Sequence, residues 1–315
     1  MTTSLIVGGT GTLAGALIPL LLSDPRITRI RCLSRGEHKQ EEFRERFKGE
    51  RIDWFLGDVR DKERVLLASE GCEQVYHLAA HKGVDSAEYQ PTECIATNVL
   101  GTHNVIYAAR KNLVGRVIFT STDKSVEPIN IYGATKLVAE KMMVEANVGR
   151  HSTRYSVCRY GNVLGSNGSV VQKWRQGWNS VTDPNMTRFF IRPKEAANFV
   201  YSGMTYMEGG EVFIPKMKST TIGELYSCVR KDKTFNIVGV RPGEKFHECL
   251  CSKHEADLVT DFGWCFVRWP EFGLFPSRKR GSEVEADLLN QIRNDGYTSF
   301  VAPRFSPEEL ESICQ

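Results

Sequence analysis

The sequence lacks a long hydrophobic run, an excess of either charge and an internal repeat. Its longest apolar stretch, residues 13–22, is about half of what a bilayer-spanning helix needs and contains Pro19, so we expect a buried helix and no membrane span. The net charge is only +3, with 41 Lys and Arg against 38 Asp and Glu. This balance gives no support for nucleic-acid binding, although phosphate-bearing small ligands remain open.

The cysteines lack the spacing of disulfides or zinc sites. There are nine, an odd number, and the chain starts with a strand-like segment, Leu5–Val7, where a secretory signal would stand. We therefore expect a cytoplasmic protein with reduced thiols. The segment His247–His254 holds two histidines and two cysteines. Because a Cys-x-Cys pair with one histidine on each side is not a zinc pattern, we predict no metal there.

What the sequence does contain is an alternation of strand-like and helical segments. This alternation predicts a Rossmann-type α/β fold with a doubly wound parallel sheet. We expect residues 1–165 to form an NADP-binding domain, with a helix over 192–207 packing back on it. Residues 166–315 are expected to form mainly a substrate-binding region, and residues 269–283, with the solvated basic triplet 278–280, a surface loop. The expected strands are 5–7, 29–33, 52–56, 74–78, 116–120, 156–159 and 210–215, and the expected helices include 39–47 and 91–111.

A glycine-rich turn, Gly8-Gly-Thr-Gly-Thr-Leu-Ala-Gly15, follows the first strand and precedes a helix. In this order, backbone N–H groups and the helix N-terminus can bind a pyrophosphate. A plain tight turn is the alternative, since Ala14 stands where a third glycine allows the closest helix packing. The second strand ends in Ser34 and Arg35, where NAD-binding proteins usually present an acidic residue. An arginine suits a 2′-phosphate, which favours NADP.

Two further segments are candidates for cofactor contacts. Asp58 lies in a turn after the third strand, where it can accept a hydrogen bond from an adenine amine or simply cap the next helix. Ala79 and Ala80 follow the fourth strand, and their small side chains let a cofactor lie close to the backbone.

Residues 120–136 gather several candidate proton-handling side chains at a strand end, a loop and a helix start. Tyr132 and Lys136 are four residues apart and share a helix face, so we expect the ammonium to lower the phenol pKa toward neutrality. Asp123 and Lys124 follow the strand at its carboxyl end, where parallel sheets bind ligands. Because neighbouring strand residues face opposite ways, both can reach a substrate only if the strand has ended there. The alternative is an exposed charged pair followed by a Tyr and a Lys that merely pack.

As a set, these motifs resemble the inverting UDP-N-acetylglucosamine 4,6-dehydratases, extended short-chain dehydrogenases/reductases of the CapD-like polysaccharide-biosynthesis group. The most specific match is Thr-Asp-Lys at 122–124 closely before Pro-Ile-Asn-x-Tyr-Gly-Ala-Thr-Lys at 128–136. Sugar 4-epimerases lack the Asp-Lys pair, and dTDP-glucose dehydratases have Asp-Glu there. The chain departs from the family at 79–84, where Ala-Ala-His-Lys-Gly-Val replaces Ala-Ala-Leu-Lys-His-Val, and at Phe190, which replaces a tryptophan. Further matching segments are 8–12, 34–35, 57–61, 159–163, 168–170, 186–189 and 237–245.

The resemblance implies a role for each residue of the 120–136 stretch. Tyr132 and Lys136 promote oxidation at carbon 4 of the sugar, with hydride passing to NADP⁺. Lys124 is the base that removes the proton on carbon 5, Asp123 the acid that helps the carbon 6 hydroxyl leave as water, and Thr122 a hydrogen-bonding partner of the sugar. Return of the hydride to carbon 6 and inversion at carbon 5 give a UDP-2-acetamido-2,6-dideoxy-4-hexulose for surface polysaccharide or glycan biosynthesis.

The motifs and the resemblance together define two sets of binding residues. The resemblance also implies a homo-oligomer, such as a hexamer. A nucleotide-sugar 4-epimerase, which needs only Tyr132 and Lys136, and a catalytically silent NADP-binding regulator are the alternatives. The expected cofactor contacts are Gly8, Thr10, Gly11, Thr12, Leu13, Ser34, Arg35, Asp58, Val59, Ala79, Ala80, Lys82, Asn98, Tyr132 and Lys136. The expected contacts to the UDP-sugar are Lys82, Thr122, Arg159, Asn162, Ser169, Val170, Thr187, Arg188, Arg241 and Glu244.

Overall fold

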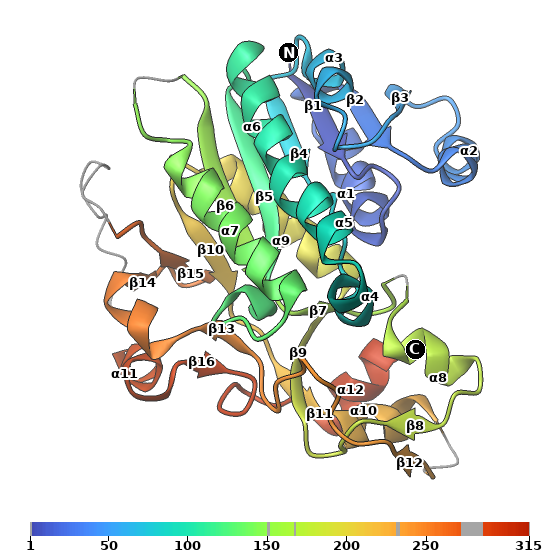
Figure 1. Cartoon of the computed structure of the whole chain (residues 1–315), viewed down its shortest axis with the longest axis vertical. Helices are drawn as coiled ribbons and strands as arrows, with labels where there is room; N and C mark the ends of the chain where they lie inside the picture. Colours follow the sequence, from blue (N-terminus) through green and yellow to red (C-terminus); the bar gives the residue numbers. More distant parts are fainter. Residues whose placement is uncertain (1, 150–151, 167, 231–233, 272–285, 315) are drawn as a thin grey trace.

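A nine-stranded sheet forms the centre of the structure, a computed structural model that describes residues 2–149, 152–166, 168–230, 234–271 and 286–314 (Figure 1). From β10 to β3 all neighbouring strands are parallel, which confirms the predicted doubly wound sheet. The strand order is β14 (Val259–Asp261), β15 (Cys265–Arg268), β10 (Val212–Pro215), β6 (Arg154–Tyr160), β5 (Arg116–Thr122), β4 (Gln74–His77), β1 (Thr2–Val7), β2 (Ile27–Ser34) and β3 (Ile52–Leu56).

Helices cover both faces of this sheet. On one face α3 (Lys62–Ser69), α6 (Gly101–Lys111) and α7 (Ile131–Glu145) pack side by side, and on the other α1 (Thr12–Ser23) packs against α9 (Pro193–Tyr206) (Figure 1). The strands are apolar on both sides because both sides are covered, and the side chains of Leu5–Val7 are at most 1% exposed. Helix α2 (Glu37–Arg46) packs against β3 at the edge.

The structure differs from the sequence prediction in one helix and in the C-terminal part of the chain. The helix expected over 91–111 is divided into α5 (Pro91–Ile95), a π-helical turn (Ala96–Leu100) and α6. The C-terminal part does more than cover a substrate, because β10 extends the parallel sheet and β15 and β14 add two antiparallel strands at its edge. These strands have only three or four residues each, too few to show a periodicity that predicts their place in a sheet.

The remaining elements form a smaller region beyond the carboxyl ends of the parallel strands (Figure 1). It has its own apolar cluster around Trp174, Met186 and Tyr226. The expected surface loop over 269–283, including its basic triplet, lies almost entirely outside the described residues. The elements of this region are β7 (Asn162–Val163), α8 (Val170–Arg175), β8 (Ser180–Val181), β9 (Thr187–Ile191), β11 (Ser219–Thr221), α10 (Ile222–Val229), β12 (Asn236–Ile237) and α12 (Pro307–Cys314). The exceptions are β13 (Cys249–Cys251), α11 (Ala286–Asp295) and β16 (Tyr297–Thr298), which pack on the main core, and α4 (Val84–Tyr89), which packs against α5 and α7.

Within the described ranges, we find no helix that combines the length and the hydrophobicity needed to cross a membrane. The same residues contain no group of three or more His, Cys, Asp or Glu side chains arranged to hold a metal ion. In the His247–His254 segment, the cysteines lie in β13 and are buried, and the His247 ring bonds through Nδ1 to the Thr187 hydroxyl at 2.7 Å. These side chains therefore serve packing and hydrogen bonding.

Candidate active site

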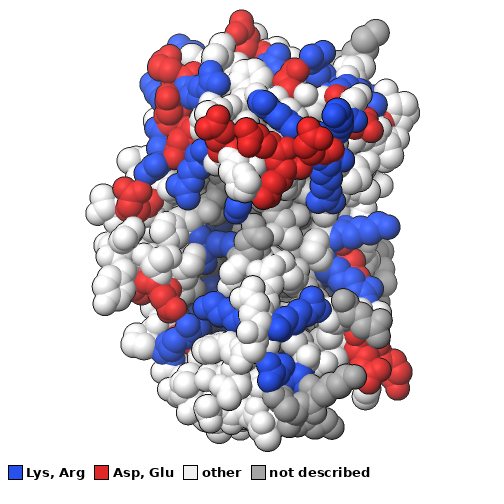
Figure 2. Space-filling view, turned by 90° about the vertical axis from the view of Figure 1, so that its right-hand side faces the viewer, with Lys and Arg blue, Asp and Glu red and all other residues white. Residues whose placement is uncertain are grey.

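A cavity of about 640 Å³ lies between the carboxyl ends of the parallel strands and the smaller region. Figure 2 shows Lys and Arg side chains gathered around a hollow on this face of the molecule, with Asp and Glu side chains above it. Both predicted sets of binding residues contribute to its walls. The predicted residues that line it are Gly8, Gly11, Thr12, Leu13, Ala80, Lys82, Thr122, Lys124, Tyr132, Lys136, Asn162, Ser169, Val170, Arg188, Arg241 and Glu244.

The glycine-rich turn forms the cofactor end of the cavity. Gly8 has φ +93°, and a Cβ there would lie 2.8 Å from the Ala79 nitrogen, so only glycine fits between the ends of β1 and β4. Helix α1 starts directly after Gly11, which offers the helix end no side-chain cap. Its first residues, Thr12 and Leu13, line the cavity. Backbone N–H groups and a helix N-terminus facing a cavity suit a dinucleotide pyrophosphate.

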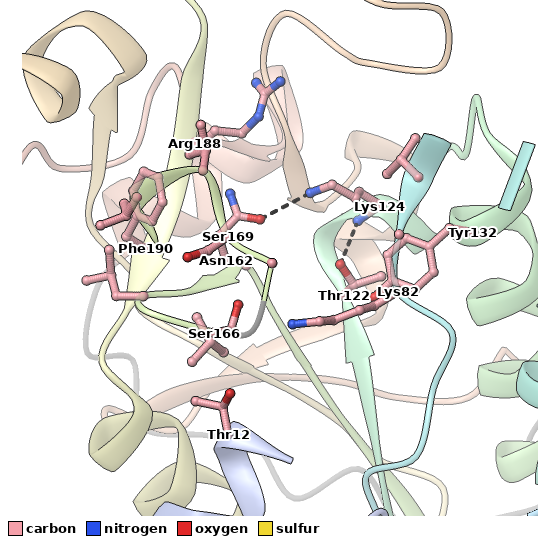
Figure 3. Close-up of a pocket in the computed structure, with 18 of the residues that line it drawn as sticks. Thr12, Lys82, Thr122, Lys124, Tyr132, Asn162, Ser166, Ser169, Arg188 and Phe190 are labelled. Carbon is pink, nitrogen blue, oxygen red and sulfur yellow. Dashed lines mark hydrogen bonds between the residues drawn. The ribbon is translucent and has the colours of Figure 1, made fainter. Parts of the chain in front are cut away.

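Strand β5 ends at Thr122, and a 3₁₀ turn over Asp123–Ser125 follows at once. The strand therefore ends early enough for the next residues to leave its alternating pattern. Lys124 reaches the cavity wall, where its Nζ lies 3.4 Å from Oδ1 of Asn162 (Figure 3). The same Nζ lies 3.1 Å from Oδ1 of Asp123. Gly133 makes this possible, because a Cβ there would overlap the Lys124 carbonyl oxygen. The glycine lets α7 pack directly against the turn.

Asp123 lies behind this wall and has no exposed surface. Its Oδ1 accepts hydrogen bonds from the Thr122 hydroxyl at 2.9 Å and from Lys124 at 3.1 Å, and Thr122 and Lys124 both line the cavity. The expectation that Asp123 and Lys124 both face a substrate therefore needs correction. Lys124 does so directly, whereas Asp123 reaches the cavity through these two neighbours.

The protonation equilibria of the pair are shifted by burial and by charge. Burial raises the pKa of Asp123, and the nearby Lys124 ammonium only partly opposes this. Burial also lowers the pKa of Lys124, but the carboxylates of Asp123 and Glu248 outweigh it and raise this pKa overall. The site thus places a carboxyl group with a raised pKa beside an amine with a raised pKa, so the neutral form of Lys124 is a strong base but the minor form.

Tyr132 and Lys136 share one face of α7, as predicted, but their expected coupling is wrong. Burial raises the pKa of Tyr132 to about 12, and the cation that opposes this shift is Lys124. Lys136 donates a hydrogen bond from Nζ to the Thr120 carbonyl and lies 3.9 Å from the centre of the Phe119 ring. Burial lowers the pKa of Lys136 to about 7. Because burial dominates both groups, the phenol pKa is not lowered toward neutrality.

Arg159 is the clearest misplacement among the expected sugar-binding residues. Its guanidinium is 2% exposed and lies between Glu140 and Glu255, at 2.7 and 2.9 Å. A third contact runs from Nη1 to the Leu250 carbonyl at 3.0 Å. Since its hydrogen-bonding capacity is used inside the protein and it does not line the cavity, the structure contradicts the prediction that Arg159 contacts the UDP-sugar.

Several expected cofactor contacts also lie off the cavity wall. Asn98 sits in the π-helical turn and bonds the backbone N–H and carbonyl of His81 at 2.8 and 3.0 Å, so it supports the 79–82 segment from behind. Asp58 pairs with Arg60 at 2.7 Å, and the cap of α3 is Asp61, so the capping alternative for Asp58 is wrong. The other predicted contacts that do not line the cavity are Thr10, Ser34, Arg35, Val59, Ala79 and Thr187.

Two features of the cavity were not predicted. Glu248 lines it beside Lys124, with Oε1 3.2 Å from Nζ. The only sequence signal for Glu248 is its place in the His247–His254 segment. The histidines and cysteines of that segment suggest a metal site, and nothing in it predicts a role for the carboxylate. The second feature is an apolar wall from the smaller region, made of Trp174, Trp178, Val181, Phe190 and Ile222.

The fold and the Tyr132–Lys136 pair beside a glycine-rich turn define a Rossmann-type protein of the short-chain dehydrogenase/reductase kind. Residues 4–268 match the family model described as "Polysaccharide biosynthesis protein", and the chain belongs to this family.

Individual relatives carry two different activities in their names. A relative from Campylobacter jejuni subsp. jejuni serotype O:23/36 (strain 81-176), named UDP-N-acetylglucosamine 4,6-dehydratase (inverting), is 43% identical over 97% of this chain and 94% of its own length. A relative from Rickettsia canadensis (strain McKiel), named UDP-glucose 4-epimerase, is 35% identical over 99% of this chain and 94% of its own length. The solved structure of Pen from Bacillus thuringiensis superposes with a TM-score of 0.88 at 32% identity, covering 99% of this chain and 96% of that one.

Proposed function

We propose that this chain catalyses the NADP-dependent 4,6-dehydration of UDP-N-acetylglucosamine with inversion at carbon 5. The product is a UDP-2-acetamido-2,6-dideoxy-4-hexulose for surface polysaccharide or glycan biosynthesis. The observation that carries the proposal is the placement of Lys124, an amine on the cavity wall with a carboxyl group 3.1 Å away. The similarity to the Campylobacter relative supports the choice of substrate.

Each residue of the site has a task in this reaction. A nicotinamide cofactor would be held by the glycine-rich turn and the start of α1, and it would supply the redox chemistry by taking up and returning the hydride of carbon 4. Tyr132, with Lys136 beside it, exchanges the proton of the carbon 4 hydroxyl. Lys124, in its neutral form, removes the proton on carbon 5, which the ketone at carbon 4 acidifies. Asp123, whose pKa is raised by burial, passes a proton through the Thr122 hydroxyl to the leaving oxygen on carbon 6.

The nucleotide end of the substrate fits the smaller region. Its apolar wall includes Trp178 and Phe190, whose rings offer flat surfaces to a base. Arg188 reaches the cavity from β9 (Figure 3), and Arg241 comes from the segment after β12, where it pairs with Glu244 at 2.6 Å and Asp85 at 2.8 Å. Arginines are suited to a diphosphate because their N–H groups match its oxygens.

The choice of NADP over NAD rests on Arg35. Its side chain is 69% exposed at the end of β2, and its ion pair with Asp58 is long, at 3.9 Å. A ribose 2′-phosphate would offer it a stronger partner. We expect Arg35→Ala to weaken NADP binding by about tenfold or more while changing NAD binding less than about twofold, measured by titration of each cofactor. Equal effects on both cofactors would contradict this preference.

The reaction itself is tested with UDP-N-acetylglucosamine in deuterated water. We expect a keto product that has lost one water and carries deuterium at carbon 5, detected by mass spectrometry and NMR. Recovery of unchanged substrate with no exchange would contradict the proposal.

A nucleotide-sugar 4-epimerase is the second candidate, because the Rickettsia relative has that name. This reaction needs Tyr132 and Lys136 but neither Asp123 nor Lys124. It would yield a sugar that is epimerised at carbon 4, that has lost no water and that carries no deuterium at carbon 5. The same incubation therefore separates the two candidates. We further propose a homo-oligomer, such as a hexamer, which light scattering of the purified protein tests.

A further inference from the structure

Glu248 is a buried carboxylate on the cavity wall beside the proposed base. It is 2% exposed, and its Oε1 lies 3.2 Å from Nζ of Lys124 and 3.7 Å from Nε of Arg188. The backbone N–H of Glu248 donates to the Ser299 hydroxyl at 2.9 Å, which fixes the segment before β13. Among the described residues, its second oxygen, Oε2, has no hydrogen-bond partner. A buried carboxylate with unused capacity at a cavity calls for an explanation.

The two carboxyl groups that flank Lys124 have opposite tendencies. Burial raises the pKa of Asp123. Burial acts in the same direction on Glu248, but the charges of Lys124, Arg188 and Lys245 outweigh it and lower the pKa of Glu248. Two carboxyls with pKa values displaced in opposite directions are a common basis for dividing acid and base tasks. Here Asp123 favours the protonated form and Glu248 the ionised form.

We propose that Glu248 is a positioning residue for the dehydration, which holds the Lys124 amine at the cavity wall and stabilises the positive charge that Lys124 gains on taking a proton. This inference rests on the proposed function. In the step concerned, the bond between carbon 5 and hydrogen breaks and an N–H bond forms on Nζ. The electron pair forms the double bond between carbons 5 and 6 as the carbon 6 oxygen leaves. The proton of Asp123 departs with that oxygen as water, and Glu248 itself stays ionised throughout.

The neighbouring groups explain why a carboxylate is needed at this position. Asn162 also bonds Nζ, at 3.4 Å, but a neutral amide can orient the amine without balancing its charge. Asp123 cannot be the counter-ion while it serves as the protonated acid. Arg188 faces the same region and repels the ammonium, so an anion between the two cations reduces this repulsion. Of the groups around Nζ in the described part of the chain, only Glu248 can remain an anion during the step.

Glu248→Gln tests the inference because it keeps the shape and an acceptor oxygen but removes the charge. Asp123, Glu248, Arg188 and Tyr132 are the titratable and charged groups that act on Lys124. Without the carboxylate, Lys124 should lose its proton more readily. We expect the acidic limb of kcat/KM for water loss to move to lower pH by about one unit or more. On the alkaline side of this limb, where Lys124 is neutral in both proteins, we also expect kcat to fall by about tenfold because the amine is a weaker base, while KM changes less than about twofold.

Two further variants control the experiment. Glu309→Gln removes the carboxylate of another Glu–Lys pair, with Lys218, whose side chains are 45% and 42% exposed; it should leave the pH profile unchanged. Glu248→Asp keeps the charge but shortens its reach, so it should lower kcat and retain the wild-type limb. If Glu248→Gln proves unfolded by melting temperature, a limb displaced to lower pH in Glu248→Asp would overturn the inference.

The outcomes separate this inference from the proposed function. A wild-type protein that releases no water from UDP-N-acetylglucosamine overturns the proposed function, and the inference with it. A wild type that does release water, together with a folded Glu248→Gln variant that has the same pH limb and kcat, overturns the inference alone. A displaced limb with reduced kcat supports it, since a purely structural role would leave the limb in place.

Discussion

Two buried clusters near the ends of adjacent strands each hold a basic side chain between two carboxyl groups. Their tasks differ. One is Arg159 at the end of β6, between Glu140 and Glu255. The other follows β5, where Lys124 lies between Asp123 and Glu248. The hydroxyl of Ser125, in the turn that carries Lys124, donates to Glu140 at 2.6 Å and so connects the two.

The clusters differ in how completely their hydrogen-bonding groups are used. Arg159 donates to both carboxylates and to the Leu250 carbonyl, and it lies away from the cavity. In the Lys124 cluster, one oxygen of Asp123 and one of Glu248 have no partner among the described residues. Burial and charge pairing alone therefore do not identify a catalytic group. Unused capacity next to a cavity distinguishes the cluster that can act on a ligand.

The largest effect expected from this comparison is on catalysis. Lys124→Ala removes the proposed base, and we expect dehydration of UDP-N-acetylglucosamine to fall by about 10³-fold or more. The cofactor end of the cavity is untouched, so NADP affinity should stay within about twofold. Turnover is measured as keto-sugar formation and affinity by fluorescence titration. Unchanged turnover would contradict the assignment of Lys124 as the base.

The matching change in the other cluster should affect stability. Arg159→Met leaves the buried Glu140 without its cation and Glu255 with only its other partner, Arg268, at 3.3 Å. We expect the free energy of unfolding to fall by about 3 to 5 kcal/mol, measured in urea. Lys218→Met, which breaks the half-exposed pair with Glu309, should cost at most about 1 kcal/mol. A large rise in KM for the UDP-sugar with unchanged stability would instead restore Arg159 as a substrate contact.

Much of the fold could be predicted from the sequence because its signals are local. The apolar strands, the glycine-rich turn and the position of Tyr132 and Lys136 on one helix face depend on residues close together in the chain. The sequence also indicates that the strand has to end near Thr122 if both following side chains are to reach a substrate. The structure has a 3₁₀ turn there, at Asp123–Ser125. These elements bring most of the predicted site residues to one cavity.

The parts that could not be predicted depend on distant contacts. Arg159 lies in β6 and Lys124 just beyond the end of β5. The positions of Glu255 and Glu248, far along the chain from both, separate a structural cation from one at the cavity. The pKa of Tyr132 was misjudged because helix spacing gives a neighbour but not its burial. Neighbours contributed by other elements decide these properties, and a single sequence does not reveal them.

The smallest expected effect concerns a third buried basic side chain, Lys136. Burial lowers its pKa from 10.5 to about 7, so between these values the unfolded chain binds a proton that the folded chain does not. The free energy of unfolding should therefore rise with pH across this window, by up to about 1.4 kcal/mol per pH unit. Lys136→Met should remove this contribution, measured as the wild-type minus variant difference in urea at pH 7 and pH 9 without added cofactor. The control is Lys141→Met on the same helix, where the side chain is 53% exposed and paired with Glu271, and its difference should not change with pH. Parallel pH profiles for wild type and Lys136→Met would show that Lys136 keeps its charge in the folded protein, as Arg159 and Lys124 do.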